Sequence, residues 1–143
     1  MPWGYAFAML LLSACGLVQQ DEVARVRSPS GNADAVLIES NGGATTSYGY
    51  AVYVVPAGAE VDEAGRVANL EGADRNDQAS GANLRWTGPS YLRIEFLSAE
   101  QAQVVRSHLN VGNESVVVSL RDSIVDPEAP PGGMAAARSQ TRQ

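Results

Sequence analysis

The feature of the sequence that most constrains the fold is an alternation of apolar and polar residues with a period of two. It is clearest in residues 91–97, which read YLRIEFL. The apolar positions are Leu92, Ile94 and Phe96, and the charged positions between them are Arg93 and Glu95. Successive side chains of a β-strand point to opposite faces of a sheet, so this spacing places the apolar set in a core and the charged set toward water. The chain is therefore predicted to fold as sheets with at least one covered face.

A first hairpin is predicted around a glycine-rich turn. Residues 35–40 (AVLIES) and 48–56 (YGYAVYVVP) are rich in β-branched and aromatic residues, and they flank NGGATTS at 41–47. In the second strand, Tyr48, Tyr50, Val52 and Val54 share one face and Ala51, Tyr53 and Val55 the other. Because both faces are apolar, this strand is predicted to be central and covered on both sides. Pro56 lacks the N–H that a ladder needs and so ends the strand.

A second hairpin is predicted from residues 84–86 and 91–97, which are separated by the turn residues TGPS. Residues 115–122 (SVVVSLRD) repeat the alternation, with Val116, Val118 and Leu120 on one face and Val117, Ser119 and Arg121 on the other. Shorter candidates are residues 23–27 and 66–70. The pattern predicts a mostly β protein, a small antiparallel sandwich or half-barrel of six to seven strands.

Residues 98–110 fit two patterns. Ser98 and Gln101 have capping-box spacing, which favours the start of a helix. The stretch QVVRSHL within the segment alternates like a strand and lies between two predicted strands. We predict an extended segment here. The polar, acidic and glycine-rich residues on either side of 66–70 are predicted to be surface connections.

The N-terminal residues have the order of a secretory signal peptide. The first fourteen residues carry no charged side chain, run apolar from Ala6 to Leu12, and shrink to Ser13 and Ala14 before Cys15. The sequence LSAC resembles the bacterial lipobox, which implies removal of residues 1–14 and acylation of Cys15 at its thiol and its new amine. Several acyl chains hold a protein stably on a membrane, whereas one is marginal. Cys15 is therefore predicted to be the lipid-bearing first residue of the mature protein.

Two alternatives remain for this segment. A transmembrane helix is disfavoured, because the apolar run is well short of the roughly 20 residues that span a bilayer. An ordinary signal peptide with an incidental cysteine is the other alternative, since the usual positively charged leader is missing. A start codon further upstream, or the use of arginine for every basic residue of the chain, accounts for that absence.

These boundaries divide the chain into four parts: a signal peptide at 1–14, a lipidated tether at 15–22, a β-domain at 23–126 and a tail at 127–143. The tail contains a Pro/Gly cluster and no apolar period, so it is predicted to be disordered. The chain without its leader is long enough for one domain with its own core. It has no second cysteine, so packing rather than disulfides must hold the domain together.

The charge of the chain excludes two classes of partner. The formal net charge is −6 at pH 7, and no basic cluster is present. A nucleic-acid-binding protein needs a clustered basic face, as does a protein that binds membranes through basic residues. The expected partners are the membrane, contacted through the N-terminal lipid, and an envelope protein or ligand. Gly16 after the cysteine favours the periplasmic face of the outer membrane over the inner membrane.

Residues 28–58 resemble a family of small bacterial envelope proteins, many with lipoboxes. The family signature runs Ser-Pro-Asp-Gly, a strand, Asn-Gly-Gly-Ala-Thr-Thr-Ser-x-Gly-Tyr and a strand ending at proline; here the corresponding residues are SPSGNADAVLIESNGGATTSYGYAVYVVP. The likeness extends loosely through residues 84–96. The sequence departs from the signature at Ser30 and lacks an aromatic-rich segment near Leu109. The resemblance implies fold and location, and it implies no catalytic residues because the family has no assigned activity.

No catalytic, cofactor or metal motif is found. A Ser-His-Asp triad needs a base, and the only histidine is His108. Ser30 and Ser47 both lack the flanking glycines of a Gly-x-Ser-x-Gly elbow. ADRNDQ at 73–78 lacks the glycine and the closing glutamate of a calcium loop. No cofactor or metal is expected, and His108 is predicted to be a structural residue of a strand or loop.

The remaining candidate is the turn NGGATTSYGY. As a plain turn, its glycines supply positive φ and its hydroxyls satisfy local backbone groups. As a recognition surface, the same glycine amides, hydroxyls and two tyrosine rings would contact a partner. The candidate binding residues are Gly42, Gly43, Thr45, Thr46, Ser47, Tyr48 and Tyr50. The predicted function is a membrane-anchored envelope lipoprotein that acts as a non-enzymatic binding or interaction module; the alternatives are a periplasmic hydrolase with an unrecognised site and a structural spacer.

Overall fold

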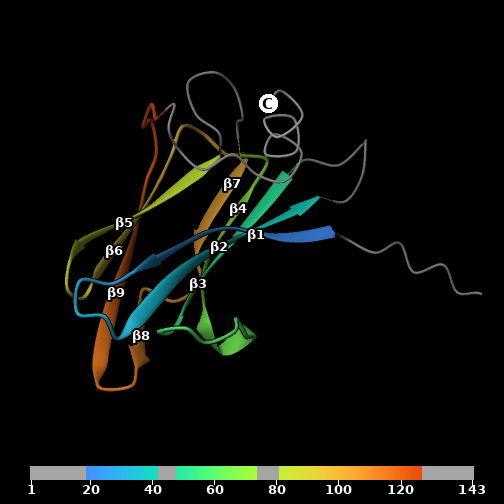
Figure 1. Ribbon diagram of the computed structural model, residues 1–143. Helices are drawn as coiled ribbons and strands as arrows, with labels where there is room; N and C mark the ends of the chain where they lie inside the picture. The colour runs from blue at the N-terminus through green and yellow to red at the C-terminus, as the bar shows by residue number, and fades with distance from the viewer. Residues whose placement is uncertain (1–18, 42–47, 74–80, 127–143) are drawn as a thin grey trace, which may run out of the picture.

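The structure, a computed structural model, describes residues 19–41, 48–73 and 81–126 (Figure 1). These residues form nine β-strands and one short 3-10 helix, and they contain no α-helix. The elements are β1 (Gln19–Arg27), β2 (Ala33–Asn41), β3 (Tyr48–Pro56), η1 (Glu63–Gly65), β4 (Arg66–Glu71), β5 (Ala82–Gly88), β6 (Tyr91–Phe96), β7 (Gln101–Val104), β8 (His108–Val111) and β9 (Glu114–Arg121). Within the described residues, no helix has the length and apolar character needed to cross a membrane.

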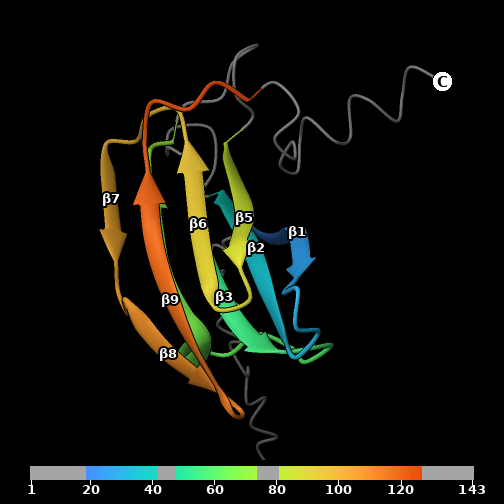
Figure 2. The same ribbon diagram turned by 90° about the vertical axis from the view of Figure 1, so that its left-hand side faces the viewer.

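The strands form two sheets that pack face to face, as Figures 1 and 2 show. One sheet has the order β1-β2-β3-β4-β7, and the other has the order β5-β6-β9-β8. β6 and β9 run parallel, while the strands of both predicted hairpins run antiparallel. The predicted all-β fold is confirmed as a two-layer sandwich. The predicted six to seven strands were too few, because the described residues contain nine.

The predicted hairpin of β2 and β3 is confirmed. The two strands pair from Ala33 opposite Pro56 to Asn41 opposite Tyr48. β3 lies between β2 and β4, so it is a central strand as predicted. Its two faces enter separate clusters: Tyr50, Val52 and Val54 belong to the main core, and Tyr53 and Val55 to a smaller cluster that includes Val36.

The main core lies between the sheets. Its largest fully buried side chains include Leu37, Val52, Val67 and Leu70 from one sheet and Leu92, Ile94 and Val116 from the other. The predicted inward orientation of Leu92, Ile94 and Phe96 is confirmed, since all three are buried. The alternation in residues 91–97 therefore correctly predicts which face of β6 packs in the core.

The prediction that Glu95 faces water was wrong. Glu95 points away from the main core as expected, but it is buried. Arg85 of β5 places its Nε 3.2 Å from Glu95 Oε2, and Arg93 places its Nη1 3.6 Å from Oε1. Arg85 and Arg93 lie opposite each other in the hairpin, so both can reach the same carboxylate and cover it.

The extended prediction for residues 98–110 is confirmed, but the segment forms two strands in different sheets. β7 pairs with β4, and β8 pairs with β9. Between them the chain crosses from one sheet to the other. The Val105 and Arg106 N–H groups donate to the Val67 carbonyl at 2.8 and 3.2 Å, and the Val118 N–H donates to the Ser107 carbonyl at 2.9 Å. This crossing ties the two sheets together along one side.

The predicted boundary between tether and domain requires correction. β1 begins at Gln19, whereas the domain was predicted to begin at residue 23. Residues 19–22 pair with the last part of β2, from Gln19 opposite Asn41 to Glu22 opposite Ile38. Backbone pairing makes this polar stretch a strand at the edge of its sheet, where an apolar alternation is not required.

Candidate functional site

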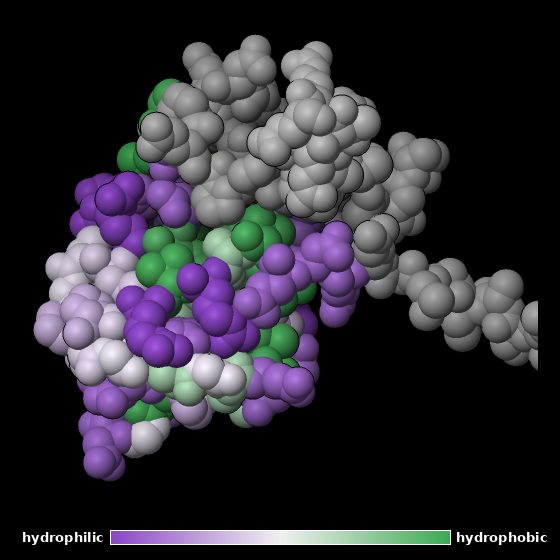
Figure 3. Space-filling view, viewed as in Figure 1, coloured by the Kyte–Doolittle hydropathy of each residue, from purple (hydrophilic) through white to green (hydrophobic). Residues whose placement is uncertain are grey.

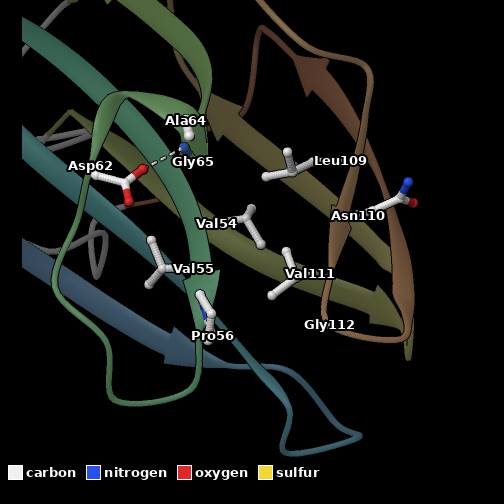
Figure 4. Close-up of a pocket in the computed structure, with 10 residues that line it drawn as sticks. All are labelled: Val54, Val55, Pro56, Asp62, Ala64, Gly65, Leu109, Asn110, Val111 and Gly112. Atoms are coloured by element: carbon white, nitrogen blue, oxygen red, sulfur yellow. Dashed lines mark hydrogen bonds between the residues drawn. The ribbon is translucent and has the colours of Figure 1, made fainter.

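The candidate site is a hollow at one end of the sandwich, where β3 runs past the start of β4. β4 begins at Arg66, which lies opposite Tyr53, so the last three residues of β3 extend beyond that pairing. The chain between β3 and β4 returns through η1. A hollow of about 230 Å³ lies between the end of β3, η1 and β8 (Figure 4). It is lined by Val54, Val55, Pro56, Asp62, Ala64, Gly65, Leu109, Asn110, Val111 and Gly112, and we call it the β3–β8 hollow.

The side chains that give the β3–β8 hollow its character are aliphatic. Leu109 and Val111 of β8 point toward β3, and Val54 of β3 lies opposite them (Figure 4). Asn110, between them in the sequence, points away. This follows from strand geometry, because alternate side chains of β8 point to opposite faces. The hollow is thus an apolar recess with polar groups at its margin.

η1 forms one wall of the hollow, and its position depends on Asp62 and Gly65. The Asp62 carboxylate accepts a hydrogen bond from the Gly65 N–H at 3.1 Å, which caps the short helix. A Cβ atom on Gly65 would lie 2.7 Å from the Val54 carbonyl oxygen. Only glycine therefore allows η1 to approach the β3 backbone this closely.

A second hollow of about 310 Å³ adjoins the first and shares Pro56, Val111 and Gly112 with it. Asn32 and Asn113 complete its lining. The Asn32 side-chain amide donates to Glu114 Oε1 at 3.4 Å, which links the β1–β2 connection to the start of β9. The two hollows therefore occupy the end of the sandwich where β3 ends and the β8–β9 hairpin turns.

Asp34 forms hydrogen bonds that hold the connection after β3 in place. It is 1% exposed, and it accepts hydrogen bonds from Arg25 Nη1 at 3.1 Å, Arg27 Nε at 3.0 Å and the Gly58 N–H at 2.8 Å. Burial alone would raise the pKa of Asp34, but the hydrogen bonds from Arg27, Gly58 and Arg25 outweigh it and lower the pKa to about 2. Gly58 belongs to the connection between β3 and η1, and η1 forms one wall of the hollow. The Asp34 carboxylate therefore helps to position this wall.

Arginines near Asp34 and η1 are also engaged within the protein. Arg25 donates to Glu22 at 2.8 Å and to the Ala59 carbonyl at 3.0 Å, and the hydrogen bond with Glu22 raises the Arg25 pKa. Arg66 donates to the Tyr53 hydroxyl at 2.9 Å and to Glu63 at 2.6 Å. On the face seen in Figure 3, hydrophilic side chains are interspersed with smaller hydrophobic areas.

The lining of the β3–β8 hollow is mostly aliphatic and backbone in character. Its lining includes one carboxylate, Asp62, and no serine, cysteine or histidine. His108 is exposed at the start of β8 and lines neither hollow; its Nδ1 lies 3.1 Å from the Ser107 hydroxyl oxygen. Within the described parts of the chain, no group of three histidine, cysteine or acidic residues could hold a metal ion. The arrangement suits an apolar side chain of a partner flanked by polar groups.

Most of the site residues predicted from sequence lie outside the described residues. These are Cys15, Gly42, Gly43, Thr45, Thr46 and Ser47, together with the side chain of Tyr48. Residues 74–78, which belong to a predicted surface connection, and the predicted tail at 127–143 also lie outside. Their roles remain predictions.

Tyr50 is described, and its assignment to a recognition surface was wrong. The residue is 2% exposed and belongs to the main core. Its hydroxyl donates to Glu39 Oε2 at 2.9 Å, and a Cβ atom on Gly81 would collide with that hydroxyl. Tyr50 shares its strand face with Val52 and Val54, so its ring points between the sheets and not toward a partner.

The described residues form a β-sandwich of nine strands with a shallow apolar recess at one end. Comparisons with protein-family models, with curated proteins and with solved structures find no match for this chain. The resemblance of residues 28–58 to the envelope-protein family remains a prediction.

Proposed function

We propose that this chain is a lipid-anchored protein of the bacterial cell envelope whose β-sandwich is a non-enzymatic binding or interaction module. The observation that carries the proposal is the position of LSAC, which ends at Cys15, four residues before β1 begins at Gln19. Acylation at this position would join a folded domain to the membrane through a very short tether. The proposed location is the periplasmic face of the outer membrane, and the family resemblance supports an envelope location.

The β3–β8 hollow supports binding rather than catalysis. Apolar recesses with a few polar groups at their margin are common binding sites for side chains and small ligands. A hydrolase would need a base held beside a nucleophile. His108 and Ser107 are in contact, but both are exposed and neither lines the aliphatic recess. The predicted surface at Gly42, Gly43, Thr45, Thr46, Ser47 and Tyr48 is the second candidate for partner contact.

Metabolic labelling tests the proposal. Cells producing the full chain should incorporate a labelled fatty acid into it, and Cys15→Ser should lose both the label and membrane association because the acceptor thiol is gone. Ser119→Ala, an exposed change on β9, is the matched control and should keep both. A Cys15→Ser variant that stays fully in the membrane fraction would reject the lipid anchor.

A further inference from the structure

We infer that the end of the sandwich at which β1 begins faces the lipid bilayer, and that the β3–β8 hollow is held at the opposite end. This inference rests on the proposed acylation of Cys15. It assigns a membrane-facing surface to the domain and a direction of approach to any partner of the hollow.

The pairing of the first sheet defines the membrane-facing end. Gln19 pairs with Asn41, and Asn41 pairs with Tyr48 at the start of β3. Glu71 pairs with both Gly49 and Gln101, so β4 ends and β7 begins at the same level. We call this end, marked by Gln19, Asn41, Tyr48, Glu71 and Gln101, the proximal end.

The distal end is defined by the same ladders. Pro56 ends β3 opposite Ala33, and Pro56 lines both hollows together with Val111 and Gly112. β3 contains nine residues, so about 26 Å of extended chain separates its two ends. The hollows and the start of β1 therefore lie a full strand length apart.

The tether is shorter than this strand length. Cys15 and Gln19 are four residues apart, and at most about 3.6 Å per residue gives a reach of about 14 Å. An acylated Cys15 sits at the membrane surface, so Gln19 cannot move further from the bilayer than this reach. The distal end has no comparable restraint, and the average position of the domain places it further from the lipid.

The paired arginines and the negative net charge disfavour adhesion of the flanks of the domain to an anionic lipid surface. Binding to an anionic lipid surface uses clusters of unengaged basic residues. Here Arg25 and Arg27 are paired with Asp34, and Arg85 and Arg93 are paired with Glu95. The formal net charge of the whole chain is −6, so the protein has little attraction for anionic lipid, and the acyl chains provide the attachment.

Depth-dependent fluorescence quenching tests this orientation on the full lipidated chain. An acylated Cys15 leaves no free thiol, so single cysteines can carry a dye: Gln101→Cys at the proximal end, Ser119→Cys between the ends and Asn113→Cys at the distal end. All three side chains are exposed. In phosphatidylcholine vesicles with a nitroxide quencher on the lipid headgroup, we expect quenching several-fold stronger at position 101 than at 113, with 119 intermediate.

The outcomes separate the orientation from the anchor. Equal quenching at the three positions, or the reverse order, in protein that floats with the vesicles would overturn the orientation alone. The order should persist in vesicles that contain phosphatidylglycerol, whereas flat adhesion through a flank would remove it and likewise overturn the inference. Dye uptake by the chain without an added cysteine, together with failure to float, would reject the anchor, and the inferred orientation would fall with it.

Discussion

Replacing Asp34 by asparagine tests how much its hydrogen-bonded carboxylate, which holds the connection between β3 and η1, contributes to stability. Asp34→Asn keeps the shape of the side chain and removes the charge that Arg25, Arg27 and the Gly58 N–H all contact. In the folded protein the pKa of Asp34 falls from an ordinary 3.8 to about 2. Each pKa unit is worth about 1.4 kcal/mol, so ionised Asp34 contributes about 2 kcal/mol to the free energy of unfolding at neutral pH.

The pH dependence of this contribution has a definite sign. Because the folded state binds the proton more weakly than the unfolded state, the stabilisation is complete above the unfolded pKa near 4. It is lost as the pH falls from about 4 toward about 2, where the folded carboxyl also takes up a proton. Urea unfolding at a series of pH values should therefore show the wild type and Asp34→Asn converging across this range.

The control is Asp122→Asn, an exposed carboxylate outside the hollow, which should change the free energy of unfolding by less than about 0.5 kcal/mol. The reasoning would be refuted if Asp34→Asn cost no more than this control at pH 7. It would also be refuted if the difference from the wild type stayed constant down to pH 3.

Two further predictions concern the core and the first turn. Ile94 is fully buried, so Ile94→Ala should lower the free energy of unfolding by about 2 to 5 kcal/mol. Arg93→Ala on the opposite face should cost less, because Arg85 keeps its ion pair with Glu95; equal losses in denaturant unfolding would contradict the register. Joint replacement of Thr45, Thr46 and Ser47 by alanine should leave the melting temperature within a few degrees and abolish capture of a co-purifying envelope component, if the turn is a recognition surface. A marked fall in melting temperature with unaltered capture would leave the turn as scaffold, since each lost local hydrogen bond costs about 0.5 to 1.5 kcal/mol.

The strands with a local pattern were predictable from the sequence. β2 with β3 and β5 with β6 are hairpins whose alternation and turn residues lie close together in the chain, so both their pairing and their buried faces followed directly. The burial of Tyr50 was available from the same alternation, because it has the parity of Val52 and Val54. Tyr50 was assigned to a binding surface because it is close in sequence to the glycine-rich turn, although its position in the strand predicts burial.

The remaining features depend on contacts between distant parts of the chain. Alternation in residues 98–110 indicates extended structure but does not say which sheet each half joins. β1 is polar over residues 19–22, and only its pairing with β2 makes that part a strand. The burial of Glu95 requires Arg85 from the neighbouring strand. The hollow joins Val54 to Leu109 and Val111, and no local pattern reports that β3 and β8 approach each other.

The mass of the N-terminal peptide tests the central claim most directly. Cleavage after arginine of the protein purified from membranes should release residues 15–25, CGLVQQDEVAR, carrying a diacylglyceryl group on the Cys15 thiol and an acyl chain on its amine. Mass spectrometry should find this acylated peptide as the N-terminus of the mature chain. An N-terminal peptide that begins at Met1 and contains an unmodified Cys15 would contradict the account.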